Sequence, residues 1–125
     1  MKKNKLREHI KKGQPLLSTR FWSTQPFFWE AIGETGIFDY VEFLAEYAPY
    51  DLTDLPNIAR AAELNDMGTM IKVDFQNRGF VAQKAIQAGF QSIMFVDHTS
   101  AEQVRESVNL VKPKTENGTG IFGYP

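Results

Sequence analysis

Short β-rich runs alternate with longer segments of helical periodicity along this sequence, and this alternation constrains the fold more than any other feature. The predicted strands span residues 16–22, 38–44, 70–75 and 91–96, and the predicted helices span 27–35, 54–65, 78–88 and 100–111. A parallel connection needs a crossover long enough to hold a helix, so four such units predict an α/β protein with a parallel sheet. A closed (β/α) barrel and an open, doubly wound, flavodoxin-like sheet share this local pattern.

Charged residues alternate with apolar ones inside the second and third predicted strands. The apolar face of these strands carries Val41, Phe43, Ala45, Ile71 and Val73. Glu42, Lys72 and Asp74 fall on the opposite face. A parallel sheet covered by helices on both sides is apolar on both faces, so the charges favour a barrel interior. We therefore predict four βα units that form the N-terminal half of a parallel (β/α)8 TIM barrel. An ion pair between Glu42 and Lys72 on neighbouring strands explains the charges equally well.

The segment before the first predicted strand has a different pattern from the rest of the chain. Leu6 and Ile10 stand four residues apart among basic residues, and Gly13 follows them, which predicts a short surface helix within residues 1–14. Residues 15–125 are then predicted to be half of a barrel domain and a piece of a longer chain, because four strands leave two unpaired edges. The alternative is that two copies pair to close the barrel.

The composition limits the possible partners. The 125 residues include no cysteine and carry a formal net charge of -1, and no apolar run is long enough to span a membrane. A chain with this charge does not attract nucleic acid or anionic membranes, so small metabolites are the expected ligands. These features predict a cytoplasmic protein with no membrane partner and no nucleic-acid partner.

Three short motifs carry weak functional signals. Residues 118–123 match G-x-G-x-x-G, but they follow a loop and precede no helix, so a dinucleotide site is not expected. Neither His9 nor His98 has a second ligand at metal-binding spacing. Asp97 and His98 end the fourth predicted strand, where barrel enzymes place functional groups, although an ordinary loop pair is the simpler interpretation.

Aromatic residues are crowded into the first βα unit. The five rings are Phe21, Trp22, Phe27, Phe28 and Trp29. The inner face of one helix does not require so many, so we predict that part of this cluster lies in the subunit interface of a homo-oligomer. Base stacking on single-stranded nucleic acid is the alternative, and the slightly acidic net charge argues against it.

Several segments resemble, in the same order, those of a known enzyme family. The most distinctive is FDYVEFLAEYAP at residues 38–49, and the others are Pro26, Glu30, Leu55 and residues 60–63, 71–73, 88–91 and 100–102. Together they resemble the HpcH/HpaI aldolases, the 2,4-dihydroxyhept-2-ene-1,7-dioate aldolase family, from about Leu17 onward. The resemblance implies a (β/α) barrel, of which this chain is the N-terminal half.

The resemblance also implies a carbon–carbon lyase that adds a pyruvate enolate to an aldehyde, or runs the reverse reaction. In such enzymes a divalent ion chelates pyruvate and stabilises its enolate, so Mg²⁺ or Mn²⁺ is the expected cofactor. The metal ligands of the family lie further along the barrel, so no metal ligand is expected in this chain. At the matching positions, the predicted catalytic residues are Glu46, Tyr47 and Lys72, and the predicted substrate-binding residues are Glu42, Lys72 and Asp74.

The chain departs from the family pattern at positions that carry the chemistry. Tyr47 stands where the family has its catalytic histidine, Leu44 where it has an assisting aspartate, and Lys72 where an arginine binds the substrate carboxylate. Val96 and Asp97 replace a Pro-His pair. A tyrosine is a poor general base at neutral pH unless a cation such as Lys72 stabilises its phenolate. A lysine is also a less directional carboxylate anchor than an arginine.

We therefore expect an aldolase-like lyase, acting on a small 2-oxo acid and an aldehyde, that is incomplete and hence inactive in this chain alone. In a mechanistic variant, Lys72 has a depressed pKa among apolar neighbours and forms a Schiff base with the oxo acid. The alternative is a non-catalytic half barrel that binds a metabolite or acts as a scaffold, because the Asp–His pair of the family is absent.

Overall fold

The sheet is fully parallel, and its strands follow one another in sequence order. The computed structural model describes residues 3–123, so the outermost residues of the predicted segments 1–14 and 15–125 lie outside the described part. The strands are β1 (Ser18–Phe21), β2 (Tyr40–Leu44), β3 (Gly68–Val73) and β4 (Ser92–Phe95), and all neighbours are parallel. An open doubly wound sheet reverses its strand order part-way, so the order β1-β2-β3-β4 confirms the predicted half barrel.

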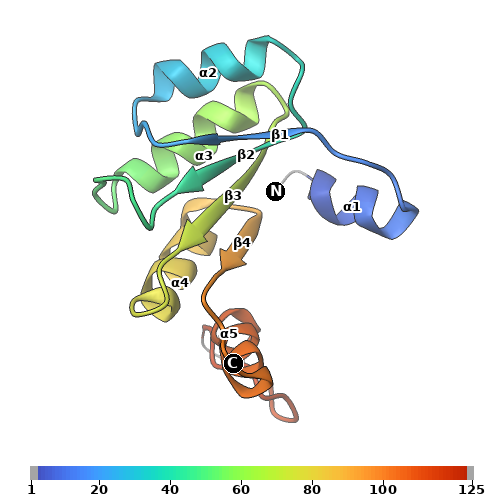
Figure 1. The fold of residues 1–125 in the computed structure, drawn as a ribbon, viewed down its shortest axis with the longest axis vertical. Coiled ribbons are helices and arrows are strands. Elements are labelled where there is room, and N and C mark those ends of the chain that lie inside the picture. Colours follow the sequence, from blue (N-terminus) through green and yellow to red (C-terminus); the bar gives the residue numbers. More distant parts are fainter. Residues whose placement is uncertain (1–2, 124–125) are drawn as a thin grey trace.

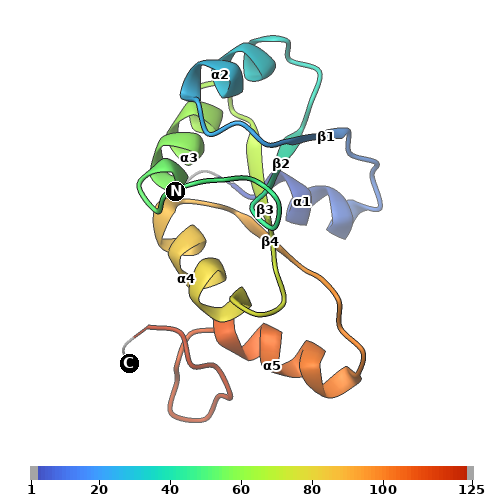
Figure 2. The same ribbon diagram turned by 60° about the vertical axis from the view of Figure 1, so that its left-hand side comes forward.

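A helix follows every strand and lies on the outside of the sheet. These helices are α2 (Pro26–Glu34), α3 (Asp54–Leu64), α4 (Arg78–Ala88) and α5 (Ala101–Val111). Each helix contacts the next one along the chain, and Figures 1 and 2 show the four arranged in an arc around the twisted sheet. Within residues 3–123, no helix combines the length and the apolar character needed to cross a membrane.

The remaining helix, α1 (Lys5–Lys12), lies on the opposite side of the sheet from α3 (Figure 1). Asn4 caps its first turn, and Gly13 ends it with a left-handed backbone at φ 64°. The Asn4 side chain also donates to the Gln91 carbonyl at 2.6 Å, and Lys5 pairs with Asp66 at 3.0 Å. These contacts hold α1 beside the residues that begin β3 and β4. The C-terminal ends of the strands therefore stay uncovered by α1.

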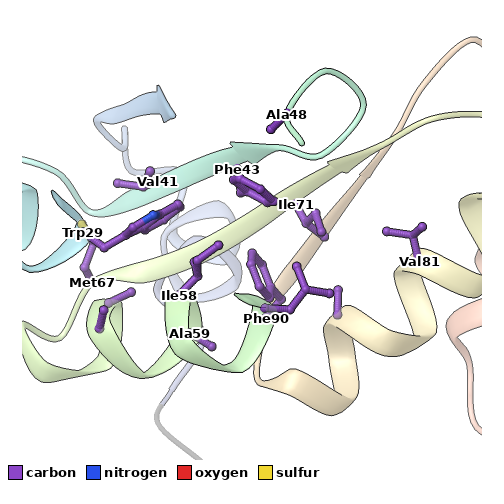
Figure 3. Close-up of a cluster of buried hydrophobic side chains, with 14 of the residues drawn as sticks. Trp29, Val41, Phe43, Ala48, Ile58, Ala59, Met67, Ile71, Val81 and Phe90 are labelled. Atoms are coloured by element: carbon purple, nitrogen blue, oxygen red, sulfur yellow. The ribbon is translucent and has the colours of Figure 1, made fainter. Parts of the chain in front are cut away.

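The hydrophobic core lies between the sheet and the helices α2, α3 and α4 (Figure 3). Its largest fully buried apolar side chains are Trp29, Phe43, Leu55, Ile58, Ile71, Val41 and Val73. The apolar face predicted for β2 and β3 is therefore confirmed. The Trp29 ring packs edge-on against Phe21 and Phe43, with centroids 5.5 and 6.2 Å away, and its Nε1 donates to the Ser23 carbonyl at 2.7 Å.

The observed strand boundaries differ from the predicted ones where pairing sets the limits. β3 begins at Gly68, two residues earlier than predicted, because Gly68 pairs with Tyr40 at the start of β2. A Cβ at position 68 would lie only 3.1 Å from the Tyr40 Cβ, so a glycine lets the two strands approach here. β3 also ends at Val73, which places Asp74 in the following loop. β1 is shorter than predicted because only Ser18–Phe21 pair with β2.

Candidate functional site

The predicted catalytic residues meet at the C-terminal ends of β2 and β3. Lys72 belongs to β3, whereas Glu46 and Tyr47 lie in the turn that directly follows β2. The turn folds back because the Ala48 amide donates to the Leu44 carbonyl at 2.9 Å. The Glu46 amide donates to the Lys72 carbonyl at 3.2 Å, which joins the turn to β3. In (β/α) barrels this end of the strands carries the active site.

Lys72 contacts both of the other predicted catalytic residues, Glu46 and Tyr47. Its Nζ lies 2.5 Å from Glu46 Oε2 and donates to Tyr47 Oη at 3.1 Å. The same ammonium group lies 4.6 Å from the centroid of the Tyr47 ring, within cation–π range. The Lys72 and Glu46 side chains are 19% and 16% exposed, so solvent reaches this ion pair only in part. We refer to Glu46, Tyr47 and Lys72 as the Lys72 cluster.

The ion pair keeps both of its members charged at neutral pH. The hydrogen bond from Lys72 lowers the pKa of Glu46, against the opposing effect of partial burial. The hydrogen bond to Glu46 is also the main reason why the pKa of Lys72 is raised. The predicted depression of the lysine pKa is therefore wrong, because the carboxylate outweighs the apolar neighbours. A protonated lysine is not a nucleophile, so the Schiff-base variant loses its basis.

Glu42 pairs with Arg20 on β1, and the predicted ion pair between Glu42 and Lys72 is wrong. Arg20 Nε donates to Glu42 Oε2 at 3.3 Å, and these two residues are direct partners in the strand register. The register of β2 and β3 sets Glu42 beside Met70, whereas Lys72 lies beside Leu44. Sequence reasoning missed Arg20, although its alternation with Phe21 in the first strand was a usable signal.

Asp74 shapes the loop after β3. Its Oδ2 accepts hydrogen bonds from the backbone and the side-chain amides of Asn77, at 2.8 and 2.9 Å. Asp74 acts on its surroundings through its charge, which opposes the lowering of the Glu46 pKa. Together with the larger effect of burial, it also raises the pKa of Tyr50. A substrate-binding role for Asp74 stays a prediction.

His98 forms a hydrogen bond with Ser107 on helix α5, a partner that sequence reasoning missed. His98 Nε2 lies 2.8 Å from the Oγ of Ser107, which is 1% exposed and also accepts from Arg78 Nε at 2.9 Å. Arg78 in addition donates to the Phe75 carbonyl at 2.8 Å. The preceding Asp97 adopts a left-handed backbone, with φ 59°. The network therefore joins α4, α5 and two of the strand-to-helix loops, which is a structural role.

The glycine-rich segment 118–123 packs against the chain that precedes it. Phe122 donates its amide to the Lys112 carbonyl at 3.0 Å, and Lys114 donates to the Phe122 carbonyl at 2.9 Å. A Cβ at Gly120 would lie 2.4 Å from the Pro113 carbonyl oxygen. This close packing accounts for the glycine without any ligand.

The aromatic cluster of the first βα unit divides between core and surface. Trp29 is fully buried, and Phe21 packs against it. Trp22, Phe27 and Phe28 are 56%, 71% and 48% exposed. The exposed rings are available for the predicted subunit interface, which stays a prediction.

A divalent ion has no evident site among residues 3–123. Within this range, no group of three or more His, Asp and Glu side chains is arranged to hold a metal. The acidic groups nearest to Lys72 are already engaged, Glu46 by Lys72 and Asp74 by Asn77. The described residues therefore do not fit the Mg²⁺ or Mn²⁺ that the family resemblance implies, and we assign no chemical step to a metal.

Comparison with known proteins identifies a shared fold at low sequence identity. No protein-family model and no curated protein matches the chain. Among solved structures, citrate synthase SbnG matches with a TM-score of 0.83 and 19% identity, over 96% of this chain and 47% of its own. An HpcH/HpaI aldolase from Desulfitobacterium hafniense DCB-2 has a TM-score of 0.77 and 22% identity, over 96% and 45%.

An HpcH/HpaI aldolase/citrate lyase family protein from Burkholderia cenocepacia J2315 matches with a TM-score of 0.84 and 22% identity, over 98% of this chain and 49% of its own. This chain thus spans about half the length of each of these proteins. The predicted resemblance is confirmed at the level of the fold. The chain has the fold of half of an HpcH/HpaI-type (β/α) barrel.

Proposed function

We propose that this chain is the part of an aldolase-like lyase that binds a 2-oxo acid, and that four further βα units complete its barrel. The Lys72 cluster at the C-terminal ends of β2 and β3 is the observation that carries the proposal. The aldolase fold of the matching structures supports it. The reaction is the formation or cleavage of a carbon–carbon bond between pyruvate, or a related oxo acid, and an aldehyde.

Lys72 is the residue that binds the carboxylate of the oxo acid. An ammonium group has three N–H donors; Lys72 donates one to Tyr47 and forms an ion pair with Glu46, so at least one donor remains for a ligand. Glu46 is a positioning residue, because its lowered pKa makes it a weak base and a constant partner for the ammonium group. The exposed Tyr47 supplies a hydroxyl group at the entrance of the site.

The proposed enzyme needs functional groups that this chain does not supply. The family resemblance implies a divalent ion and a general base, and the second half of the barrel is the proposed source of both. The chain alone is therefore expected to bind an oxo acid weakly and to be inactive.

Two measurements test this proposal. Turnover is assayed with pyruvate, an aldehyde and Mg²⁺ or Mn²⁺, and robust turnover by a monomer of this chain would disprove the need for a second half. Binding of pyruvate is measured by NMR titration for the wild-type chain and for Lys72→Met. We expect Lys72→Met to weaken binding by roughly tenfold or more, the value of a charged hydrogen bond.

A matched control makes the binding result specific. Lys84 lies on α4, where its ammonium group is 5.7 Å from the centroid of the Phe80 ring. Lys84→Met removes the same charge from the outer helical layer and should leave the binding of pyruvate unchanged. Equal effects of the two substitutions would contradict a specific role for Lys72.

A non-catalytic half barrel that binds a metabolite, or that acts as a scaffold, is the second candidate. The observation that favours it is that Glu46, Tyr47 and Lys72 bond to one another, which is also how a purely structural cluster would look. In that case Lys72→Met and Tyr47→Phe would leave both ligand affinity and any activity of the completed barrel unchanged.

A further inference from the structure

A second polar pair, Arg20 and Glu42, is not part of the Lys72 cluster. It lies on the inner face of the sheet, which is the face turned away from α2, α3 and α4. Arg20 alternates with Phe21, whose ring packs into the core, so Arg20 points to the opposite face together with Glu42. The two side chains differ in exposure, at 69% for Arg20 and 5% for Glu42. A buried carboxylate thus holds an arginine whose outer part is open to solvent.

The pair leaves hydrogen-bonding capacity unused on both sides. Arg20 contacts Glu42 through Nε alone, and among the described residues its two Nη groups make no hydrogen bond. Glu42 Oε1 is buried and likewise has no hydrogen-bond partner within residues 3–123. A structural arginine–carboxylate pair commonly forms two parallel bonds, which would satisfy both oxygens. Here the guanidinium group instead keeps its Nη edge free, and this edge is the part that recognises a carboxylate of another molecule.

Arg20 lies within reach of a ligand bound at Lys72. Arg20 pairs with Glu42 and Glu42 pairs with Met70, two residues before Lys72 on the same face of β3. Strand spacing and rise then separate the Cα atoms of Arg20 and Lys72 by about 12 Å. Both side chains project from the same face of the sheet, roughly perpendicular to it, so the guanidinium and ammonium groups are about as far apart as the two Cα atoms. A short linear molecule with an anionic group at each end can bridge these two groups.

The charge balance favours carboxylates over phosphates as these anionic groups. Arg20 is neutralised by Glu42, and Lys72 is neutralised by Glu46. The face therefore offers strong hydrogen-bond donors without a net positive charge. Such donors suit singly charged carboxylate groups better than doubly charged phosphate groups. The planar Nη edge of arginine also matches the two oxygens of a carboxylate.

We propose that Arg20, held in place by Glu42, is a second carboxylate anchor, and that the ligand of this site is an oxo acid with a second carboxylate. The proposal rests on the proposed function, because it assumes that Lys72 binds the first carboxylate. Arg20 touches the ligand and determines specificity, whereas Glu42 is a positioning residue that acts through Arg20.

The test compares three ligands and four forms of the chain by NMR titration. The ligands are pyruvate, 2-oxoglutarate and glutarate, which lacks the oxo group. The forms are wild type, Arg20→Gln, Arg20→Lys and Arg105→Gln, the last being a control on the exposed side of α5. We expect Arg20→Gln to weaken the binding of 2-oxoglutarate and glutarate by about tenfold and to leave the binding of pyruvate unchanged. Arg20→Lys should recover part of this loss, and Arg105→Gln should match wild type.

The outcomes separate this inference from the proposed function. Unchanged binding of 2-oxoglutarate by Arg20→Gln, with pyruvate still dependent on Lys72, overturns the second anchor and leaves the proposed function intact. Binding of glutarate that depends on Arg20, without any binding of pyruvate, supports the anchor and overturns the oxo-acid function. No binding of any of the three acids overturns both.

Discussion

At the scale of single residues, the charged side chains of the inner face belong to two separate pairs, one of which is completed by Glu46 from the turn after β2. Arg20 pairs with Glu42, and Lys72 pairs with Glu46. The alternation within each strand places charges on this face, and the register between strands decides which of them meet. The predicted Glu42–Lys72 pair therefore placed both residues on the correct face of the sheet but gave them the wrong partners.

The first prediction concerns the pH dependence of the Lys72–Glu46 pair. The pKa of Glu46 is lowered in the folded chain, so its stabilising effect is complete above its unfolded pKa of about 4.3 and is lost as the pH falls through the folded value. The pKa of Lys72 is raised, so its effect is complete below its unfolded pKa of about 10.4 and is lost as the pH rises through the folded value.

The free energy of unfolding of wild type and Glu46→Gln, measured in urea by tryptophan fluorescence, tests this dependence. The difference between the two proteins should be constant between about pH 5 and 10 and should shrink at both ends. If the difference does not vary with pH over the whole range, the ionised Lys72–Glu46 pair does not stabilise the folded chain.

At the scale of elements, the contact between α2 and α3 depends on a glycine whose role the sequence pattern does not reveal. Gly33 in α2 packs against Asn65, which ends α3 and whose Nδ2 donates to the Glu30 carbonyl at 3.3 Å. The periodicity of α2 predicts a helix at this position but not the close approach of its neighbour. The contact between the two helices thus becomes visible only in the folded chain.

The second prediction compares two glycines that both lie inside helices. A Cβ at Gly33 would lie 2.6 Å from the Asn65 Cβ, so Gly33→Ala should destabilise the chain by about 1–3 kcal/mol. At Gly79 the nearest atom is the flexible Cδ2 of Leu110 at 3.1 Å. Gly79→Ala should therefore stay within about 1 kcal/mol of wild type, because the better helix propensity of alanine offsets the contact. Urea unfolding measures both values, and a larger loss for Gly79→Ala would contradict the packing argument.

At the scale of the whole molecule, the half barrel exposes surfaces that a closed barrel would cover. β1 and β4 each have a neighbour on one side only, and the inner face carries the charged pairs. Matching solved structures are about twice as long as this chain. Unpaired strand edges are ready templates for further pairing.

The third prediction follows from these open edges and from the exposed rings of Trp22, Phe27 and Phe28. The chain should associate with itself, so light scattering should give a mass above the 14.2 kDa of one chain, increasing with concentration. The intact mass of the natural product, measured alongside, distinguishes a piece of a longer protein from a self-pairing half barrel. A mass of one chain at every concentration would be evidence against association.

The sequence by itself determined the four βα units and the apolar face of β2 and β3, because these follow from local periodicity. Glu46, Tyr47 and Lys72 were predicted as site residues from the family resemblance, and they meet because they stand at the same end of neighbouring strands. Only the tertiary structure decided the partners of the charges. A shift of the strand register changes which side chains are neighbours, and the register depends on the packing of the whole sheet, as at Gly68 and Tyr40. For the same reason, the Arg20–Glu42 pair and the raised pKa of Lys72 emerged only from the folded chain.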